Sequence, residues 1–406
     1  MEQISPNPEL ILLGILTCVI AYSLMTKLIA RTVLTLPIFF VALGFLCAPA
    51  TEALGTAEEL RGSARLLAEI TLILVLFSDA SHIRFARLKH SFTIPLRMLV
   101  IGMPLSIALG TLFVFLVSPQ SGLALALLTA AVLTPTDAAL GQTVVSSPDV
   151  PERLSQSINV ESGLNDGLVL PFVLLGAILA STYLQGTDGL AVMALTQIIL
   201  GPVAGIVVGW GAARALDFAQ QSDWVIERAQ GVVFLATAFL SLVVAELVGG
   251  NGFIAAFVAG AVFGNAYRHD IHFIGEFMEG AGQLLTMVAF LVFGALMLPN
   301  GLAHITLTTV LVAIGFLSFV RMLPIWLSLI GTDLALKEKL FVGWFGPRGL
   351  ASILFTLIMM DEFDFPYEEE LFACVSLTVA LSVLLHGISA SPLAKRIGRE
   401  SAQNSG

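Results

Sequence analysis

Apolar residues form long runs along this chain, and short polar or charged segments separate the runs. A helix needs about 20 mostly apolar residues to cross the roughly 30 Å hydrocarbon layer of a bilayer. Thirteen runs reach or approach that length, so the pattern predicts an all-α polytopic membrane protein of about thirteen transmembrane helices. The predicted centres are Thr17, Ala42, Thr71, Ser106, Ala131, Val169, Pro202, Ala238, Ala256, Ala289, Ala313, Phe345 and Val379.

Composition supports a membrane protein. Hydrophobic residues make up 57% of the 406 residues and charged residues only 12%, whereas soluble domains carry about 25% charged residues. No basic patch with interleaved aromatic residues is present, so we expect no nucleic-acid partner. The three cysteines lie in separate apolar runs and are expected to be packing residues, without a disulfide or a bound metal: Cys18, Cys47 and Cys374.

The positions of basic residues predict the orientation in the membrane. With the N-terminus outside, fifteen of the nineteen Lys and Arg residues fall in cytosolic segments, and only Arg61 and Arg65 fall outside. This agrees with the positive-inside rule. We therefore expect a multi-pass protein of the cell (inner) membrane with a cytosolic C-terminus. The acidic segment 361–370 would lie outside, either as a solvated loop or as an attractor of cations.

Two of the apolar runs carry helix-breaking residues at mid-depth. The fifth contains "LTPTDAALG" with Pro135 and Asp137, and the twelfth contains "WFGPRGLAS" with Pro347 and Arg348. Proline removes a backbone donor, so each run is expected to unwind there. Helix C-termini attract cations and N-termini attract anions. We therefore expect Arg348 to neutralise surplus helix-dipole or carboxylate charge where the two breaks cross.

The equivalent positions of the breaks predict inverted repeats of six spans each, which is the arrangement of a transporter with a site at mid-membrane. The expected single transmembrane domain covers 1–392, with repeat one at about 8–182, a linking span at about 189–214 and repeat two at about 230–390. Residues 393–406 are expected to form a short cytosolic tail.

The sixth span opens with polar residues that share helical faces. A charge at the centre of a membrane costs about 2.5–3.5 kcal/mol, so this stripe predicts a function. Asp166 is the candidate functional acid, and Glu161 is expected to pair with Arg321 of the eleventh span. One face carries Ser155, Asn159, Ser162 and Asp166, and the neighbouring face carries Glu161 and Asn165.

The chemistry of a buried carboxylate indicates what Asp166 could do. Burial disfavours a bare negative charge, so such a group holds either a proton or a hard monovalent cation. A site that holds one or the other and opens alternately to the two sides would exchange them. An intramembrane aspartyl protease built on Asp137 and Asp166 is disfavoured because its YD and GxGD motifs are absent. We therefore expect no enzyme, and we interpret Asp79 as a solvated boundary residue rather than part of an ion-entry funnel.

Four motifs resemble those of a known family. "TPTDAALG", "NVESGLNDG", "SFVRMLP" and "GPRGLAS" are similar to motifs of the NhaP-type sodium/proton antiporters, in the first monovalent cation/proton antiporter family, which is related to animal sodium/hydrogen exchangers. The resemblance implies a thirteen-span inverted-repeat fold, a homodimer in the bilayer and elevator-like movement of a six-helix core.

The same resemblance implies roles for individual residues. Asp166 would bind the ion, Thr136 would add a main-chain carbonyl, and Asp137 a carboxylate. Ser162 would complete a Na⁺ site, and Glu161 with Arg321 would form a charge pair. Arg348 matches the arginine of the family's broken twelfth span.

Two departures from the family pattern change the expectations. Ala138 stands where the family has proline, so the unwound segment could shift along the fifth span. Asn165 stands where electrogenic relatives have a second aspartate, so the resemblance implies electroneutral exchange of Na⁺, or of Li⁺, for H⁺. A K⁺/H⁺ antiporter is the alternative. No cofactor is expected beyond the transported ions.

Overall fold

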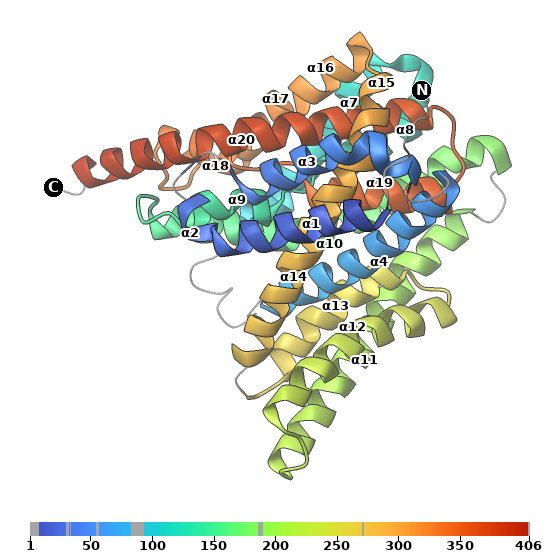
Figure 1. Cartoon of the computed structure of the whole chain (residues 1–406), viewed down its shortest axis with the longest axis vertical. Helices are drawn as coiled ribbons and strands as arrows, with labels where there is room; N and C mark the ends of the chain where they lie inside the picture. Colours follow the sequence, from blue (N-terminus) through green and yellow to red (C-terminus); the bar gives the residue numbers. More distant parts are fainter. Residues whose placement is uncertain are drawn as a thin grey trace.

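The computed structural model describes residues 8–29, 32, 34–53, 57–82, 93–185, 190–269 and 272–404, and every regular element in these ranges is helical (Figure 1). The first part of the chain forms α1 (Pro8–Leu24), α2 (Thr26–Ile29), α3 (Leu36–Cys47), η1 (Ala48–Ala53), α4 (Ala57–Ser81), α6 (Thr93–Arg97), η2 (Met98–Gly102), α7 (Met103–Val117), η3 (Pro119–Ser121), α8 (Gly122–Leu133), α9 (Ala138–Val145) and α10 (Glu152–Gln185). The second part forms α11 (Leu190–Gln221), α12 (Glu227–Leu247), α13 (Gly252–Ala266), α14 (His272–Val292), η4 (Phe293–Met297), α15 (Leu298–Ala303), α16 (Leu307–Leu317), α17 (Phe319–Ser328), α18 (Leu336–Trp344), α19 (Leu350–Glu362) and α20 (Glu368–Asn404).

The helices are long and apolar enough for a multi-pass membrane protein. Within the described ranges, seven helical segments have the length and composition to cross a bilayer, and four shorter apolar helices accompany them. Twelve of the thirteen predicted centres lie inside a helix, and the remaining one, Phe345, lies in the break after α18. The number of membrane spans and the inverted repeats remain predictions.

The helices pack into two groups. The first group consists of α3, α4 and α11–α15, in which α13 packs on both α4 and α11. The second group consists of α6–α10 and α16–α20, in which α10 packs on α8, and α20 on α16. Figure 1 shows α11–α13 at one end of the molecule and α16, α17 and α20 at the other. The groups meet where α4 contacts α10 and α19, and where α15 contacts α20.

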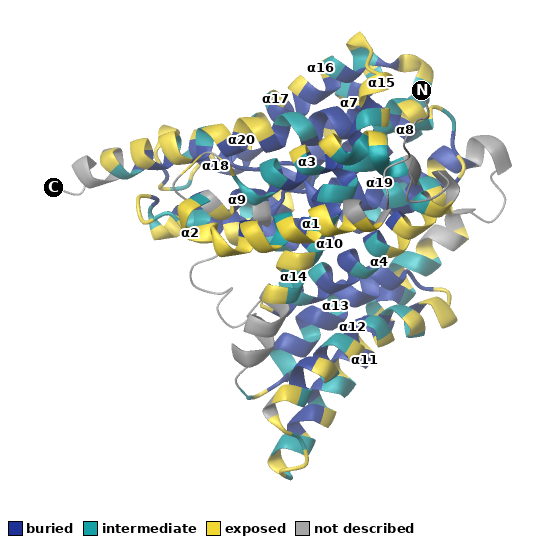
Figure 2. Ribbon diagram, in the orientation of Figure 1, coloured by how far each residue is buried: buried dark blue, intermediate teal, exposed yellow. Residues whose placement is uncertain are grey.

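Small residues allow the first group to pack closely. A Cβ added at Gly205 of α11 would lie 2.5 Å from the carbonyl oxygen of Ala255, and one at Gly209 would lie 2.4 Å from that of Ala259. Glycine therefore brings the backbones of α11 and α13 into contact, as is common between helices in membranes. Another face of α11 exposes large apolar residues, as expected of a lipid-facing surface (Figure 2): Val203, Val207 and Trp210.

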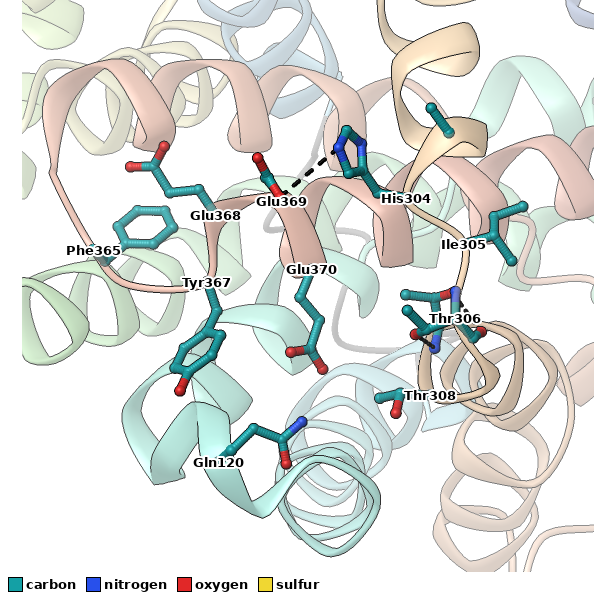
Figure 3. Close-up of a pocket in the computed structure, with 12 residues that line it drawn as sticks. Gln120, His304, Ile305, Thr306, Thr308, Phe365, Tyr367, Glu368, Glu369 and Glu370 are labelled. Carbon is teal, nitrogen blue, oxygen red and sulfur yellow. Dashed lines mark hydrogen bonds and ion pairs between the residues drawn. The ribbon is translucent and has the colours of Figure 1, made fainter.

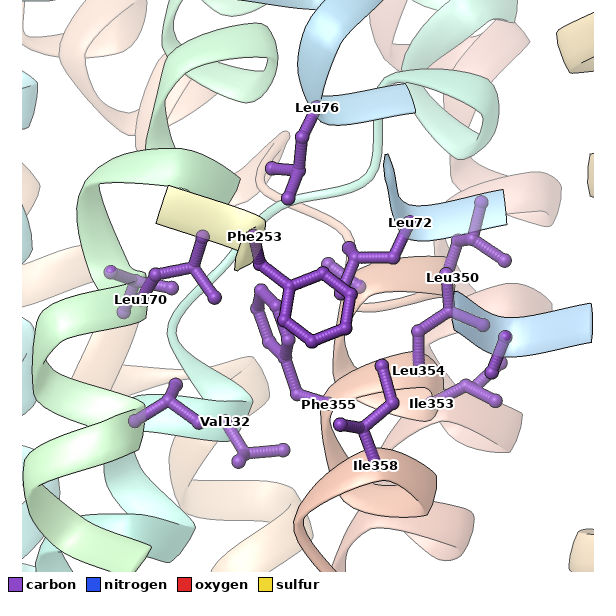
Figure 4. Close-up of a cluster of buried hydrophobic side chains, with 14 of the residues drawn as sticks. Leu72, Leu76, Val132, Leu170, Phe253, Leu350, Ile353, Leu354, Phe355 and Ile358 are labelled. Atoms are coloured by element: carbon purple, nitrogen blue, oxygen red, sulfur yellow. The ribbon is translucent and has the colours of Figure 1, made fainter. Parts of the chain in front are cut away.

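Apolar side chains fill the contact between the two groups (Figure 4). Leu72 and Leu76 of α4 and Phe253 of α13 come from the first group. They meet residues of α8, α10 and α19 in the second group, including Val132, Leu170, Leu350, Ile353, Leu354, Phe355 and Ile358. Burial of this cluster removes apolar surface from solvent on one side of both helix breaks.

The predicted tail begins inside the last helix. Helix α20 has 37 residues and continues through Pro392 to Asn404. Ala394 and Ile397 are buried in an apolar cluster with Val150 and Leu154 at the start of α10. The expected boundary at 392 therefore lies inside α20, and the division into a membrane domain and a cytosolic tail remains a prediction.

Candidate functional site

The two predicted breaks are present and lie against each other. Helix α8 ends before residues 134–137, and α18 ends before residues 345–349, with α9 and α19 beginning directly after them. The main-chain N–H of Asp137 donates to the carbonyl oxygen of Pro347 over 2.8 Å. This bond joins the two unwound segments. Each break coincides with a proline, which cannot donate a helical hydrogen bond.

Asp137 caps the N-termini of two half-helices at once. Its Oδ1 accepts the N–H of Leu140 in α9 over 3.1 Å, and its Oδ2 accepts the N–H of Leu350 in α19 over 2.6 Å. A carboxylate is favoured there because helix N-termini carry unpaired N–H groups and partial positive charge. Glycine at 349 permits this contact, since a Cβ would lie 2.1 Å from Oδ2 of Asp137.

Arg348 occupies the opposite electrostatic position, at helix C-termini. Its Nη1 donates to the carbonyl oxygens of Thr134, Pro135 and Gly346, at 2.9, 3.3 and 3.2 Å. These carbonyls follow α8 and α18, where the helix dipole is negative. Arg348 is only 1% exposed, so its charge is offset by these backbone groups rather than by water.

Glu161 and Arg321 form a buried ion pair. Arg321 donates through Nη1 to Oε1 of Glu161 over 2.6 Å and through Nη2 to Oε2 over 2.9 Å. Glu161 also accepts from Oγ1 of Thr136 over 3.2 Å. A Cβ at Gly346 would lie 2.3 Å from Nε of Arg321, so the guanidinium lies directly on the backbone of the second break. The pair therefore connects α10 with both breaks.

Asp166 differs from the other two acids because part of its carboxylate has no partner. The residue is 8% exposed, and among the described residues its buried Oδ1 has no hydrogen-bond partner. Nearby, Oγ1 of Thr136 lies 3.0 Å from Oγ of Ser162 and accepts from Nδ2 of Asn165 over 2.5 Å. Buried polar atoms are almost always hydrogen-bonded. In the described part of the chain, Oδ1 of Asn165, Nε of Arg321, and Nε and Nη2 of Arg348 also have no partner, so several polar atoms at the crossing, and Asp166 as its unpartnered acid, are available to a bound ion or water.

Asp79 belongs to the surroundings of Asp166, contrary to its interpretation as a solvated boundary residue. It is half-buried, and its Cβ lies 3.7 Å from the position that a Cβ at Gly163 of α10 would occupy. Its carboxylate interacts electrostatically with those of Asp137 and Asp166. Helical spacing could have indicated this, because Asp79 follows the buried residues Leu72 and Leu76 on one face of α4.

The predicted polar stripe of α10 divides in the structure. Ser162 and Asp166 are buried beside the breaks, whereas Asn159 is exposed and Ser155 half-buried. The neighbouring pair, Glu161 and Asn165, is buried. The structure therefore brings together all eight candidate residues of the predicted site at the crossing, and it leaves the first half of the stripe outside.

A separate cavity of about 700 Å³ lies beside the N-terminus of α20 (Figure 3). Its lining includes His304 and Glu369, whose Nε2 and Oε2 atoms lie 3.8 Å apart. No candidate site residue contributes to it. In the described part of the chain, no group of three or more His, Cys, Asp and Glu residues is arranged to hold a metal ion. Both interpretations of the acidic segment remain predictions.

Comparisons with known proteins show which chains this one is similar to. The family model described as sodium/hydrogen exchanger, transmembrane, matches residues 15–396. The K⁺/H⁺ antiporter NhaP of Alkalimonas amylolytica is 28% identical over 356 residues, covering 84% of this chain and 59% of that protein. The K⁺/H⁺ antiporter NhaP2 of Shewanella oneidensis is 26% identical over 272 residues, covering 66% and 46%.

A solved structure shares the fold. The sodium proton antiporter MjNhaP1 from Methanocaldococcus jannaschii at pH 8 superposes with a TM-score of 0.77, covering 96% of this chain and 99% of that one at 20% identity. The chain spans about half the length of the two curated relatives described above, 59% of one and 46% of the other.

Proposed function

Because this chain belongs to the transmembrane sodium/hydrogen exchanger family, a family of transporters rather than enzymes, we propose that it exchanges a monovalent cation for protons across a membrane. The observation that carries the proposal is the unpartnered, buried carboxylate oxygen of Asp166 beside two crossed helix breaks. A proton or a cation each satisfies this oxygen, and the two compete for it.

Oxygen atoms around Asp166 are suitable ligands for Na⁺, the proposed cation. Thr136 and Ser162 contribute oxygens, and their hydroxyls lie 3.0 Å apart. Asp137 accepts two backbone N–H groups, and its carboxylate lies at the same crossing of the two breaks. We propose a Na⁺ site formed by Asp166, Asp137, Thr136 and Ser162, with the ion in exchange for a proton.

The charges around the site favour electroneutral exchange. Arg321 neutralises Glu161, and the helix N-termini of α9 and α19 offset Asp137. Asn165 adds no charge. Asp166 is then the carboxylate of α10 that needs a cation, and one bound proton replaces one bound Na⁺. A membrane potential is accordingly expected to leave the exchange rate unchanged.

The two sides of Asp166 differ in polarity, which supports alternating access. Leu170 follows Asp166 on α10, and Val132 precedes the break at the end of α8. Both belong to the apolar cluster of Figure 4. Asp79 and Asn159 lie toward the opposite side. In this state the site is closed by apolar contacts on one side. Opening that side requires the two helix groups to move relative to each other, as in an elevator.

A K⁺/H⁺ antiporter on the same scaffold is the second candidate. The relatives from Alkalimonas amylolytica and Shewanella oneidensis are named as K⁺/H⁺ antiporters, whereas the solved relative is named as a sodium proton antiporter. The cation is decided by adding Na⁺, Li⁺ or K⁺ separately to vesicles with an imposed acid interior. Recovery of the interior pH with K⁺ and not with Na⁺ would replace the first candidate by the second.

The Asp166→Asn variant tests the shared site. In the same vesicles, cation addition is expected to restore the interior pH for the unchanged protein and to have no effect above background for Asp166→Asn. Glu246→Gln is the matched control, because it makes the same chemical change at an exposed residue of α12 and should retain exchange. Retained exchange in Asp166→Asn, with normal membrane insertion, would remove Asp166 from the site.

We also propose the topology expected from the basic residues: thirteen spans, inverted repeats, an outer N-terminus, and a homodimer in the cell (inner) membrane. The distribution of Lys and Arg supports the orientation. Labelling of single cysteines placed at the ends of α11 and α12, from each side of intact cells, tests it directly.

A further inference from the structure

A buried hydrogen-bonded chain connects α20 to the second helix break. His386, in the interior of α20, is 1% exposed, and its Nε2 lies 2.9 Å from the carbonyl oxygen of Trp344, the last residue of α18. Its Nδ1 lies 3.0 Å from the carbonyl oxygen of Ser382 and 3.3 Å from Oγ of the same residue. The same Oγ accepts the main-chain N–H of Arg348 over 2.6 Å.

The partners determine which atoms donate. The carbonyl oxygen of Trp344 can only accept, so Nε2 of His386 carries a hydrogen. Oγ of Ser382 accepts the N–H of Arg348, and Ser382 contacts Nδ1 of His386 through both its carbonyl oxygen and its Oγ. Ser382 and His386 therefore link the N–H of Arg348 to the carbonyl of Trp344.

One end of this chain lies at the start of the unwound residues 345–349, and the other lies within them. Trp344 ends α18, and Arg348 directly precedes the residues that turn into α19. The indole ring of Trp344 also stacks on the ring of His386, with centroids 5.1 Å apart and planes at 26°. One turn of α20 thus contacts both the end of α18 and the unwound segment that follows it.

We propose that His386 and Ser382 are positioning residues for cation binding, an inference that rests on the proposed antiport. These two residues affect the cation site indirectly, through the backbone of the second break. Holding Arg348 in place keeps its guanidinium on the carbonyl of Thr134, and holding Gly349 in place keeps the N–H of Leu350 on Asp137. Loss of the chain would let the break relax and would displace the oxygen ligands around Asp166.

Transport kinetics provide the first test. His386→Leu and Ser382→Ala are expected to raise the apparent KM for the cation about tenfold, the effect of one lost buried hydrogen bond, with a smaller change in maximal rate. His386→Gln keeps an N–H donor near the position of Nε2 and should return KM to within about twofold of the unchanged protein. A purely structural role would lower the amount of active protein without this recovery or this change in KM.

Thr378→Ala is the matched control. Thr378 is buried on the same helix, but its Oγ1 donates to the carbonyl of Cys374 within α20 and has no bond to the break. This variant should keep the KM of the unchanged protein. An equal rise of KM in Thr378→Ala and His386→Leu would contradict the inference, because it would assign the effect to α20 as a whole.

Amide hydrogen exchange provides a second test that does not depend on transport. Ser382→Ala should accelerate exchange in a peptide that contains the amide of Arg348, by about tenfold, and leave peptides of α11 unchanged. Unchanged amide hydrogen exchange at Arg348, together with an unchanged KM in His386→Leu and Ser382→Ala, would overturn the inference. The proposed function would remain intact. If the unchanged protein exchanges no cation, the proposed function fails and the transport role of His386 fails with it. Amide hydrogen exchange at Arg348 then decides only whether the hydrogen bonds of Ser382 and His386 order the second break.

Discussion

Glu161 and Arg321 are both almost completely buried, at 1% and 3% exposure, and each depends on the other for charge compensation. Removing one partner of such a pair leaves an uncompensated charge and costs about 3–5 kcal/mol. We therefore predict that Arg321→Ala strongly lowers the thermal stability of the detergent-solubilised protein. Adding Glu161→Gln to Arg321→Ala is expected to recover part of the loss, because the lone charge is then gone.

The comparison needs all four proteins: unchanged, each single variant and the double variant. Melting is followed by the change of tryptophan fluorescence in one detergent at one pH. Losses that simply add, with no recovery in the double variant, would mean that the two residues do not stabilise each other.

Gly349 is a position where a single methyl group is incompatible with the site. Its Cβ would lie 2.1 Å from Oδ2 of Asp137, so Gly349→Ala must displace the carboxylate. We predict that cation exchange falls at least tenfold, since the displaced acid loses a backbone partner and misplaces a ligand. Exchange is measured in proteoliposomes with equal amounts of folded protein.

Gly343→Ala is the control for this substitution. Gly343 lies in α18, six residues earlier, and a Cβ there would have no atom closer than 3.6 Å, which is ordinary contact. It should retain exchange. Full activity in Gly349→Ala would show that the position of Asp137 is not important for transport.

The partners of the buried charges differ in how far the sequence could predict them. The pairing of Glu161 with Arg321 follows from the cost of a lone charge in the membrane, and it is present in the structure. The partners of Arg348 and Asp137 are backbone groups, which every residue has, so no residue pattern marks them. His386 was missed because its hydrogen bonds depend on the packing of α20 against α18 rather than on any local motif.

At the scale of helices, the crossing depends on Asp137 because the two half-helices it caps are short. Helix α9 has eight residues, too few to be stable alone, and α19 has thirteen. Asp137→Asn keeps one acceptor oxygen and turns an N–H₂ group toward a backbone N–H. We predict a loss of about 1–3 kcal/mol of stability and faster amide exchange in the α9 region.

Amide hydrogen exchange in α12 serves as the internal reference for that variant. None of the hydrogen bonds described at the crossing involves a residue of α12. Equal protection of the α9 region in Asp137→Asn and in the unchanged protein would contradict the capping role.

The sequence predicted the breaks more successfully than the helix ends. Proline and glycine mark the two unwound segments because they act locally on the backbone. The first break ends at Asp137, and α9 begins at Ala138, the residue that replaces the family's proline. The end of α20 could not be predicted in this way. Proline at 392 suggests an end, but burial of Ala394 and Ile397 against α10 keeps the helix intact.

At the scale of the whole molecule, one exposed ion pair joins the two helix groups, and another lies within the second group. Arg65 of α4 pairs with Asp361 of α19, and thus connects the first group to the second. Arg153 of α10 pairs with Asp333, just before α18, and both belong to the second group. These side chains are substantially exposed, so each pair contributes little stability. Both pairs join side chains that touch, but the two pairs differ in the relative movement expected between their helices.

If the groups move relative to each other during exchange, a covalent link between them must stop transport. We predict that linking the two cysteines of the Arg65→Cys/Asp361→Cys variant with a bifunctional methanethiosulfonate reagent abolishes cation exchange and that a reductant restores it, after replacement of Cys18, Cys47 and Cys374. The Arg153→Cys/Asp333→Cys variant, linked by the same reagent, should continue to exchange the cation, because that link lies within one group. Exchange that persists in fully cross-linked Arg65→Cys/Asp361→Cys protein would rule out movement at the contact of α4 with α19. Alternating access would then have to come from local changes around the two breaks.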